Sequence, residues 1–183
     1  MVSIQIAVVG GSNPTDAELA DAEVVGAELA AAGAVVVCGG LGGVMEAACR
    51  GAKSAGGTTV GILPGTESSA ANRWVDVAVP TGMGEGRNVL VVRSAEAVIA
   101  VGGEYGTLSE ISLALRAGTP VVGLRTWSLV RPDGTADRGV EAAGDPRTAA
   151  AKALRLAAAT LRRPVATGEG ATPPEAPPPP SPG

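Results

Sequence analysis

Short apolar runs alternate with longer segments of helical periodicity along most of the chain. The periodic segments repeat Ala, Leu and Val at helical spacing and lie at 15–32, 44–55, 87–94, 107–117 and 145–161. The apolar runs are nearly continuous, as in strands covered on both faces, and lie at 4–9, 34–38, 58–63, 75–79, 97–101, 121–124 and, shorter, 139–142. Such alternation predicts parallel pairing through right-handed crossovers. We therefore expect an α/β fold, a Rossmann-like, doubly wound and mostly parallel sheet of roughly six or seven strands with helices on both faces.

Residues at the ends of two periodic segments agree with helix boundaries. Pro14 suits the first turn of the helix at 15–32, because proline lacks an N–H that this turn leaves unbonded, and Gly33 suits its C-terminal cap. Asp145 precedes Pro146 and is expected as the N-cap of the last helix.

Glycines follow three of the expected strands. Because the carboxyl ends of parallel strands meet at one edge of a sheet, these loops are expected to gather where such sheets bind ligands. Tight turns favour glycine in any α/β domain, so one loop fits a structural turn as well as a ligand site, whereas three on one edge favour a phosphate ligand. None has the complete dinucleotide fingerprint or a Walker A pattern, which disfavours NAD binding and ATP hydrolysis. The loop residues are Gly10, Gly11, Ser12, Gly39, Gly40, Gly42, Gly43, Gly103 and Gly106.

Residues 101–110 carry the strongest single indication of chemistry. A strand that ends in glycines and turns directly into a helix aims several backbone N–H groups at one point, where the positive end of the helix dipole also lies. Thr107 adds a hydroxyl donor, and Glu110, about one turn into the helix, faces whatever is bound. The segment predicts a phosphate or carboxylate site.

The composition narrows the chemistry. A net charge of −4 without a basic run argues against nucleic acid as a partner. No apolar stretch reaches membrane-spanning length and no signal peptide precedes the first strand, so we expect a cytoplasmic protein without a membrane partner. The chain has no histidine, which excludes a His general base, a Ser-His-Asp triad and a His-based metal site. Cys38 and Cys49 are expected as free thiols, and no metal site is expected.

Domain organisation follows from a change in composition. We expect one domain over residues 1–162 and a disordered tail over residues 163–183, where proline, glycine, serine and threonine replace the apolar pattern. Within the domain, Lys53 and Lys152 both fall on polar faces of expected helices, which argues against a pyridoxal phosphate Schiff base.

Several isolated residues admit two interpretations. Arg87 begins a helix, where a cation opposes the helix dipole; a bound phosphate or carboxylate explains it, and a surface arginine is the alternative. Glu46 lies in a first turn, where a carboxylate either stabilises the helix or contacts a ligand. Trp74 and Trp127 suit packing or base stacking, and Tyr105 lies inside the loop of residues 101–110.

The stretch 102–110 resembles the Pro-Gly-Gly-x-Gly-Thr-x-x-Glu signature of the LONELY GUY (LOG) family. Gly103, Gly106 and Thr107 match it position by position, as does Glu110. LOG proteins are cytokinin riboside 5′-monophosphate phosphoribohydrolases once mislabelled lysine decarboxylases. The likeness extends from the first strand to residue 124, and Arg87 falls where the family has an arginine ahead of its signature helix. The chain departs from the signature where Gly102 replaces its proline and Glu104 its second glycine.

Three further segments are more similar to a sister branch of that family. They are Gly-Val-Met-Glu at 43–46, Gly-Arg-Asn at 86–88 and Gly-Thr-Leu-Ser-Glu-Ile at 106–111. That branch includes the molybdenum-cofactor carrier protein, which holds a pterin phosphate without turning it over. The resemblance implies the same fold and anion site, and a homodimer or larger homo-oligomer. The apolar runs 89–92 and 113–115 suit packing against either the sheet or a neighbouring copy.

Three hypotheses of function result, of which the third is a structural or scaffolding domain with a vestigial site. In the first, the chain is a carrier- or sensor-like binding protein for an AMP-like nucleotide, the molybdenum cofactor or another phosphorylated heterocycle, with the glycine loops and Thr107 on the phosphate, Arg87 as a clamp, and Glu46 and Glu110 on sugar hydroxyls. In the second, it is a hydrolase that cleaves the N-glycosidic bond of nucleoside 5′-monophosphates, with Arg87 and Glu110 as the catalytic pair. The carboxylate at position 104 favours either the first hypothesis or an altered substrate. Asn88, Glu104 and Tyr105 complete the expected ligand-binding set.

Overall fold

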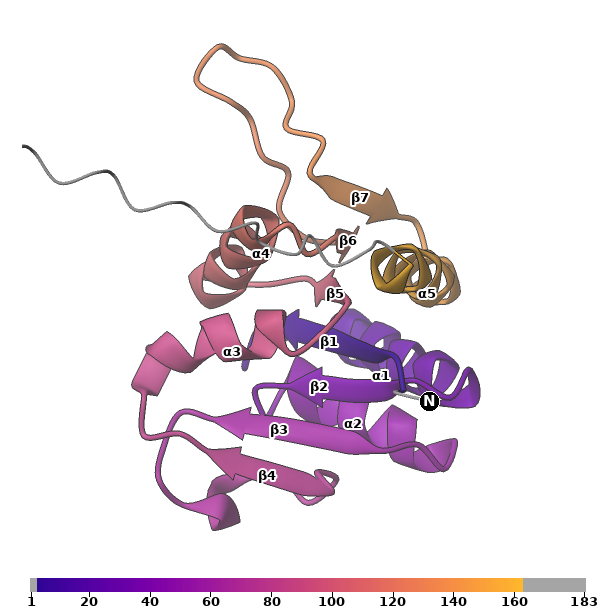
Figure 1. Cartoon of the computed structure of the whole chain (residues 1–183), viewed down its shortest axis with the longest axis vertical. Helices are drawn as coiled ribbons and strands as arrows, with labels where there is room; N and C mark the ends of the chain where they lie inside the picture. Colours follow the sequence, from indigo (N-terminus) through magenta and orange to yellow (C-terminus); the bar gives the residue numbers. More distant parts are fainter. Residues whose placement is uncertain (1–2, 163–183) are drawn as a thin grey trace, which may run out of the picture.

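Seven parallel strands form one sheet in the computed structural model, which describes residues 3–162 (Figure 1). The strand order is β4-β3-β2-β1-β5-β6-β7, and every neighbouring pair is parallel. The strands are β1 (Gln5–Gly10), β2 (Val35–Cys38), β3 (Thr59–Leu63), β4 (Val77–Pro80), β5 (Ala97–Val101), β6 (Val121–Leu124) and β7 (Val140–Ala143). The expected Rossmann-like α/β class is therefore confirmed.

Helices cover both faces of the sheet. The cores show the division, because Ile6 and Val8 of β1 pack beneath α1, α2 and α5, whereas Ala7 and Val9 pack in the core beneath α3 and α4. The elements are α1 (Asp16–Ala31), α2 (Val44–Ser54), α3 (Asn88–Arg93), α4 (Tyr105–Ala117) and α5 (Pro146–Leu161), with 3₁₀ turns η1 (Ser68–Ala70) and η2 (Gly84–Arg87). Strands with both faces covered read as continuous apolar runs, which is why their positions were visible in the sequence.

Two helix ends differ from the sequence prediction. Pro14 lies outside α1, because Thr15 is the N-cap: its hydroxyl accepts the N–H of Glu18, whose carboxylate accepts the N–H of Thr15 in return. Helix α4 begins at Tyr105 rather than at 107, so Gly106 is helical and not part of the loop. Gly33, at φ +78° just after α1, and Asp145, as the N-cap of α5, are as expected.

The order in which successive strands join the sheet reverses between β1 and β5, at the middle of the sheet. These strands are hydrogen-bonded neighbours, with Gly10 in register with Val101. After β1 the chain continues to α1 on one face, and after β5 it continues to α4 on the other. The two connections therefore separate above the strand ends and leave a crevice between them.

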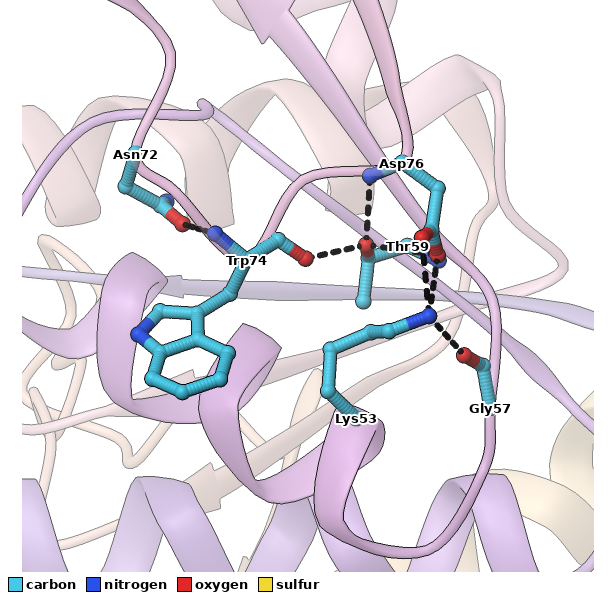
Figure 2. A network of polar contacts seen from close by, with 6 residues as sticks. All are labelled: Lys53, Gly57, Thr59, Asn72, Trp74 and Asp76. Atoms are coloured by element: carbon cyan, nitrogen blue, oxygen red, sulfur yellow. Dashed lines mark hydrogen bonds and ion pairs between the residues drawn. The ribbon is translucent and has the colours of Figure 1, made fainter.

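A polar network fastens the connection before β4 to α2 and β3 (Figure 2). Lys53 donates to the Asp76 carboxylate at 2.7 Å and to the Gly57 carbonyl at 3.0 Å, and Thr59 Oγ1 donates to the Trp74 carbonyl at 2.6 Å. Lys53 is thus engaged at the far end of α2 from the glycine loop, in a structural ion pair. The arrangement agrees with the sequence argument against a Schiff-base lysine.

The connection between β6 and β7, residues 125–139, projects away from the sheet (Figure 1). A single antiparallel bridge between Val130 and Ala136 and an ion pair between Arg131 and Asp137 hold its tip together. Within residues 3–162 no helix is both long and apolar enough to cross a membrane. The expected proline-rich tail, 163–183, lies outside the described residues.

Helices α1 and α2 approach each other through two glycines. A methyl group on Gly26 of α1 would lie 2.0 Å from the carbonyl oxygen of Ala48, and one on Gly51 of α2 would lie 1.9 Å from the carbonyl oxygen of Glu23. Backbone atoms cannot move aside cheaply, so these glycines set the spacing of the two helices.

We expect Gly26→Ala to destabilise the protein by about 1–3 kcal/mol through overpacking, although alanine normally favours a helix. Urea unfolding measures this difference. Gly144→Ala is the matched control, because no atom lies within 4 Å of the added methyl group there. Equal stability of Gly26→Ala and the wild type would contradict the close approach.

Candidate functional site

A cavity of about 330 Å³ opens in the crevice at the carboxyl ends of the strands. All three glycine-loop regions of the sequence reach it, together with the segment before α3. It is lined by Gly10, Gly11, Ser12, Leu41, Met45, Pro64, Gly84, Glu85, Arg87, Asn88, Glu104, Gly106, Thr107 and Glu110. The structure thus brings residues from five separate connections to one place, because Pro64, directly after β3, also lines the cavity.

The helices that begin at this cavity lack side-chain caps. Glu104 is the N-cap of α4 and Gly43 that of α2, and neither makes a side-chain capping bond. By contrast, Thr15 caps α1 and Asp145 caps α5. The first N–H groups of a helix have no partner within the helix, and at α4 they belong to the turn that carries Gly106 and Thr107. Uncapped N–H groups beside a cavity are suited to an anion.

Among residues 3–162, Arg87 is the only basic residue that lines the cavity, and it is buried there. It ends the η2 turn, and its Nη1 donates to Asn88 Oδ1 and lies 3.6 Å from Glu110 Oε1. Its Nε is buried without a hydrogen-bond partner among residues 3–162. A buried N–H of a charged group that lacks a partner is costly, so the protein leaves this guanidinium incompletely hydrogen-bonded.

Glu110 faces Arg87 from the second turn of α4, three residues after Thr107 and on the same side of the helix. Both side chains of the Arg87–Glu110 pair are only 9% exposed. Burial raises the pKa of Glu110 to about 7, from an ordinary value of 4.5, although the Arg87 guanidinium opposes the rise. The carboxyl group therefore exchanges its proton near neutral pH.

Some of the expected glycines make room for other parts of the site. A methyl group on Gly39 would lie 2.5 Å from Arg87 Nη2, so the guanidinium rests on this glycine. A methyl group on Gly43, at φ +66°, would lie 2.5 Å from the Gly11 carbonyl oxygen, and the Val44 N–H donates to that same oxygen at 3.2 Å. Gly39 and Gly43 thus hold the arginine and the first loop in position without lining the cavity themselves.

The remaining expected residues, which include Glu46 and Tyr105, do not line the cavity. Gly40, Gly42 and Gly103 do not line it, and Gly103 packs against the Thr107 side chain. The Glu46 carboxylate lies near Gly42, since a methyl group added to Gly42 would be 4.0 Å from Glu46 Oε2. Tyr105 is 82% exposed, with its ring 5.8 Å from that of Trp127.

Sequence reasoning did not identify five lining residues. Leu41, Met45 and Pro64 form an apolar part of the wall, and Gly84 and Glu85 belong to the η2 turn. For two of them the sequence offers a signal, which is their position: Leu41 lies inside a glycine loop, and Pro64 directly follows β3. Apolar residues at such positions are otherwise indistinguishable from core residues.

The two thiols lie beside this wall. Cys38 and Cys49 are free and buried, as expected, with their Sγ atoms 3.4 Å apart. They pack with Met45, and the Gly40 N–H donates to Cys38 Sγ at 3.3 Å. Asn72 donates to the Leu41 carbonyl at 2.9 Å and ties the glycine loop to the network of Figure 2.

Comparisons with known proteins match the chain to a family, a relative and similar solved structures. The model of the SLOG cluster4 family matches residues 3–150. An uncharacterized protein of Archaeoglobus fulgidus is 45% identical over 125 residues, which are 68% of this chain and 82% of that protein. Among solved structures, the molybdenum cofactor binding protein of Rippkaea orientalis superposes with a TM-score of 0.76 at 33% identity, covering 88% of this chain and 99% of that one. The molybdenum cofactor carrier protein of Chlamydomonas reinhardtii gives 0.74 at 35% identity, covering 85% and 99%.

The Glu110 carboxyl makes stability depend on pH. Its pKa is about 7 in the folded protein and near 4.5 in the unfolded chain, so the folded state binds the proton more tightly. Its contribution to stability is therefore fully present below about pH 4.5 and is lost as pH rises through about 7. A shift of this size corresponds to about 3 kcal/mol.

We expect Glu110→Gln to remove most of this loss when urea unfolding is compared at about pH 5 and about pH 8. Glu96→Gln is the control, because its side chain accepts the Gln5 N–H at the opposite edge of the sheet and glutamine keeps that acceptor. The interpretation of Glu110 fails if wild type and Glu110→Gln lose equal stability over this range.

Proposed function

Since this chain belongs to the SLOG cluster4 family, we propose that its cavity binds a small phosphorylated heterocycle, in the manner of a carrier or sensor. The two solved neighbours named above, from Rippkaea orientalis and Chlamydomonas reinhardtii, are a molybdenum cofactor binding protein and a molybdenum cofactor carrier protein. The single observation that carries the proposal is the buried Arg87, whose Nε lacks a partner among residues 3–162 and whose side chain lines the cavity.

The phosphate would lie at the start of α4. The N–H groups of that turn have no side-chain cap, and Thr107 lines the cavity one residue after Gly106. An anion there interacts favourably with the helix dipole and comes within reach of Arg87, whose planar fork suits phosphate oxygens. We assign phosphate binding to Gly106, Thr107 and Arg87, with Gly10, Gly11 and Ser12 on the facing loop.

The rest of the cavity suits a heterocycle. Leu41, Met45 and Pro64 offer an apolar wall, and carboxylates at the rim can accept ring N–H groups. A cavity of about 330 Å³ is at the small end of the range for ligand pockets, which agrees with a compact ligand. A pterin phosphate such as that of the molybdenum cofactor, and an AMP-like nucleotide, both meet these requirements.

A second function is favoured by Glu110 itself. A carboxyl group with a pKa of about 7 is matched to proton transfer at neutral pH, and the LOG signature that the chain resembles includes this residue. In a phosphoribohydrolase, water would add across the N-glycosidic bond of a nucleoside 5′-monophosphate, and the products would be the free base and ribose 5-phosphate. Glu110 would stabilise the oxocarbenium-like charge or accept a proton from the attacking water.

Homo-oligomer formation stays a prediction. Val91, Val92 and Ala114 are buried against the sheet, so core packing accounts for much of the apolar character of α3 and α4. Leu90 remains exposed on α3 and is available to a second copy.

Arg87→Ala should weaken the binding of AMP and of inorganic phosphate by about 1.5–3 kcal/mol, the range for a charged hydrogen bond. Isothermal titration calorimetry measures the change, and thermal unfolding verifies that the variant is folded. Arg93→Ala, at the exposed far end of α3, should bind as the wild type does. Unchanged affinity in folded Arg87→Ala would refute the phosphate site.

The hydrolase alternative is tested by release of adenine from AMP and of free base from a cytokinin riboside monophosphate, followed by chromatography. If the wild type releases base, Glu110→Gln should abolish release while AMP still binds, because the amide can neither accept a proton nor carry charge. Base release by Glu110→Gln at the wild-type rate would exclude Glu110 from catalysis. Absence of release by the wild type at high protein concentration supports the carrier or sensor.

A further inference from the structure

Glu104 occupies the position where the anion site is expected to be most positive. It is the N-cap of α4, in an extended conformation at φ −98° and ψ −167°. Its carbonyl oxygen accepts the Leu108 N–H at 3.0 Å and Trp127 Nε1–H at 3.3 Å. The backbone of Glu104 is therefore held both by its own helix, α4, and by the connection between β6 and β7.

The Glu104 side chain reaches across the crevice. A methyl group on Gly11, in the loop after β1, would lie 3.8 Å from Glu104 Cδ and Oε1. The carboxylate thus approaches the facing loop, and both residues line the cavity. Within residues 3–162 it accepts no hydrogen bond and enters no ion pair, unlike the Glu18 carboxylate that completes the α1 capping box.

The charges around the cavity do not suit a polyanion. Arg87 is the one basic side chain that the described part of the chain contributes to the lining, and Glu110 lies against it. Glu85 on the η2 turn is a second carboxylate of the lining whose side chain has no partner within residues 3–162. The uncapped N–H groups can hold one phosphate, but a second phosphate would meet carboxylates in place of cations.

We propose that Glu104 is the specificity-determining residue of this site, selecting a phosphomonoester and excluding ligands with a second phosphate. The proposal rests on the proposed function, since it assumes a phosphate at the start of α4. The Glu104 carboxylate accepts hydroxyl or amino hydrogens from the remainder of the ligand, through charge-assisted hydrogen bonds. A phosphate in the same place is repelled, because two like charges a few ångströms apart near a protein surface oppose each other strongly.

The test compares two pairs of probes by calorimetry, AMP with ADP and inorganic phosphate with pyrophosphate. The wild type should bind the monophosphate of each pair at least about tenfold more tightly than its diphosphate counterpart. Glu104→Gln, which keeps the shape and removes the charge, should narrow both ratios about tenfold by gaining affinity for ADP and pyrophosphate. Glu104→Gly should act in the same direction.

Glu96→Gln is the control, because it removes the same charge at the opposite edge of the sheet and should leave both ratios unchanged. If the wild type binds monophosphates and Glu104→Gln keeps the wild-type ratios, the role of Glu104 is overturned while the phosphate site stands. If the wild type binds none of the four probes, both the proposed function and the role of Glu104 are overturned.

Discussion

The separation of the chain after β1 and β5 is the constraint on which the rest of the site depends. The two strands are paired up to Gly10 and Val101, and beyond them the chain continues to opposite faces of the sheet. A methyl group on Gly10 would lie 2.5 Å from Val44 and 2.6 Å from the Val101 carbonyl oxygen, so the floor of the crevice is closed by packing. Helices α2 and α4 then begin at its walls without a side-chain cap among residues 3–162, and the N-terminal ends of their dipoles supply positive potential without a positive side chain.

Burying Arg87 and Glu110 beside this crevice has an energetic cost. Two charges at 9% exposure lose most of their hydration, and a separation of 3.6 Å with one arginine N–H unpaired offsets the loss only in part. The raised pKa of Glu110 has the same cause, because burial disfavours the charged form of its carboxyl group. Residual cost of this kind is typical of sites in which a ligand completes the hydrogen bonds.

The fold relates this chain to similar solved structures, whereas the charge of Glu104 distinguishes it from the LOG signature. The fold agrees with that of the molybdenum cofactor binding and carrier proteins over nearly their whole length. Glu104 places a negative group where the LOG signature that the sequence resembles has glycine, and its backbone is anchored by Trp127 from the β6–β7 connection. In the role proposed for Glu104, the anion selectivity of this framework would depend on that side chain and on its anchor, Trp127.

The order of strands and helices was determined by the sequence alone, because buried parallel strands are continuous apolar runs and helices repeat every 3.6 residues. From the glycine loops and the segment 101–110, the sequence also predicted that Thr107 and Glu110 lie at the carboxyl edge of the sheet, which is where they are found. Tertiary structure decided what the local pattern does not encode: that Gly39 lies under Arg87, and that Leu41, Met45 and Pro64 face the cavity. These facts depend on contacts between residues far apart in the chain, and an apolar residue at a strand end has the same sequence pattern whether it faces the core or a ligand.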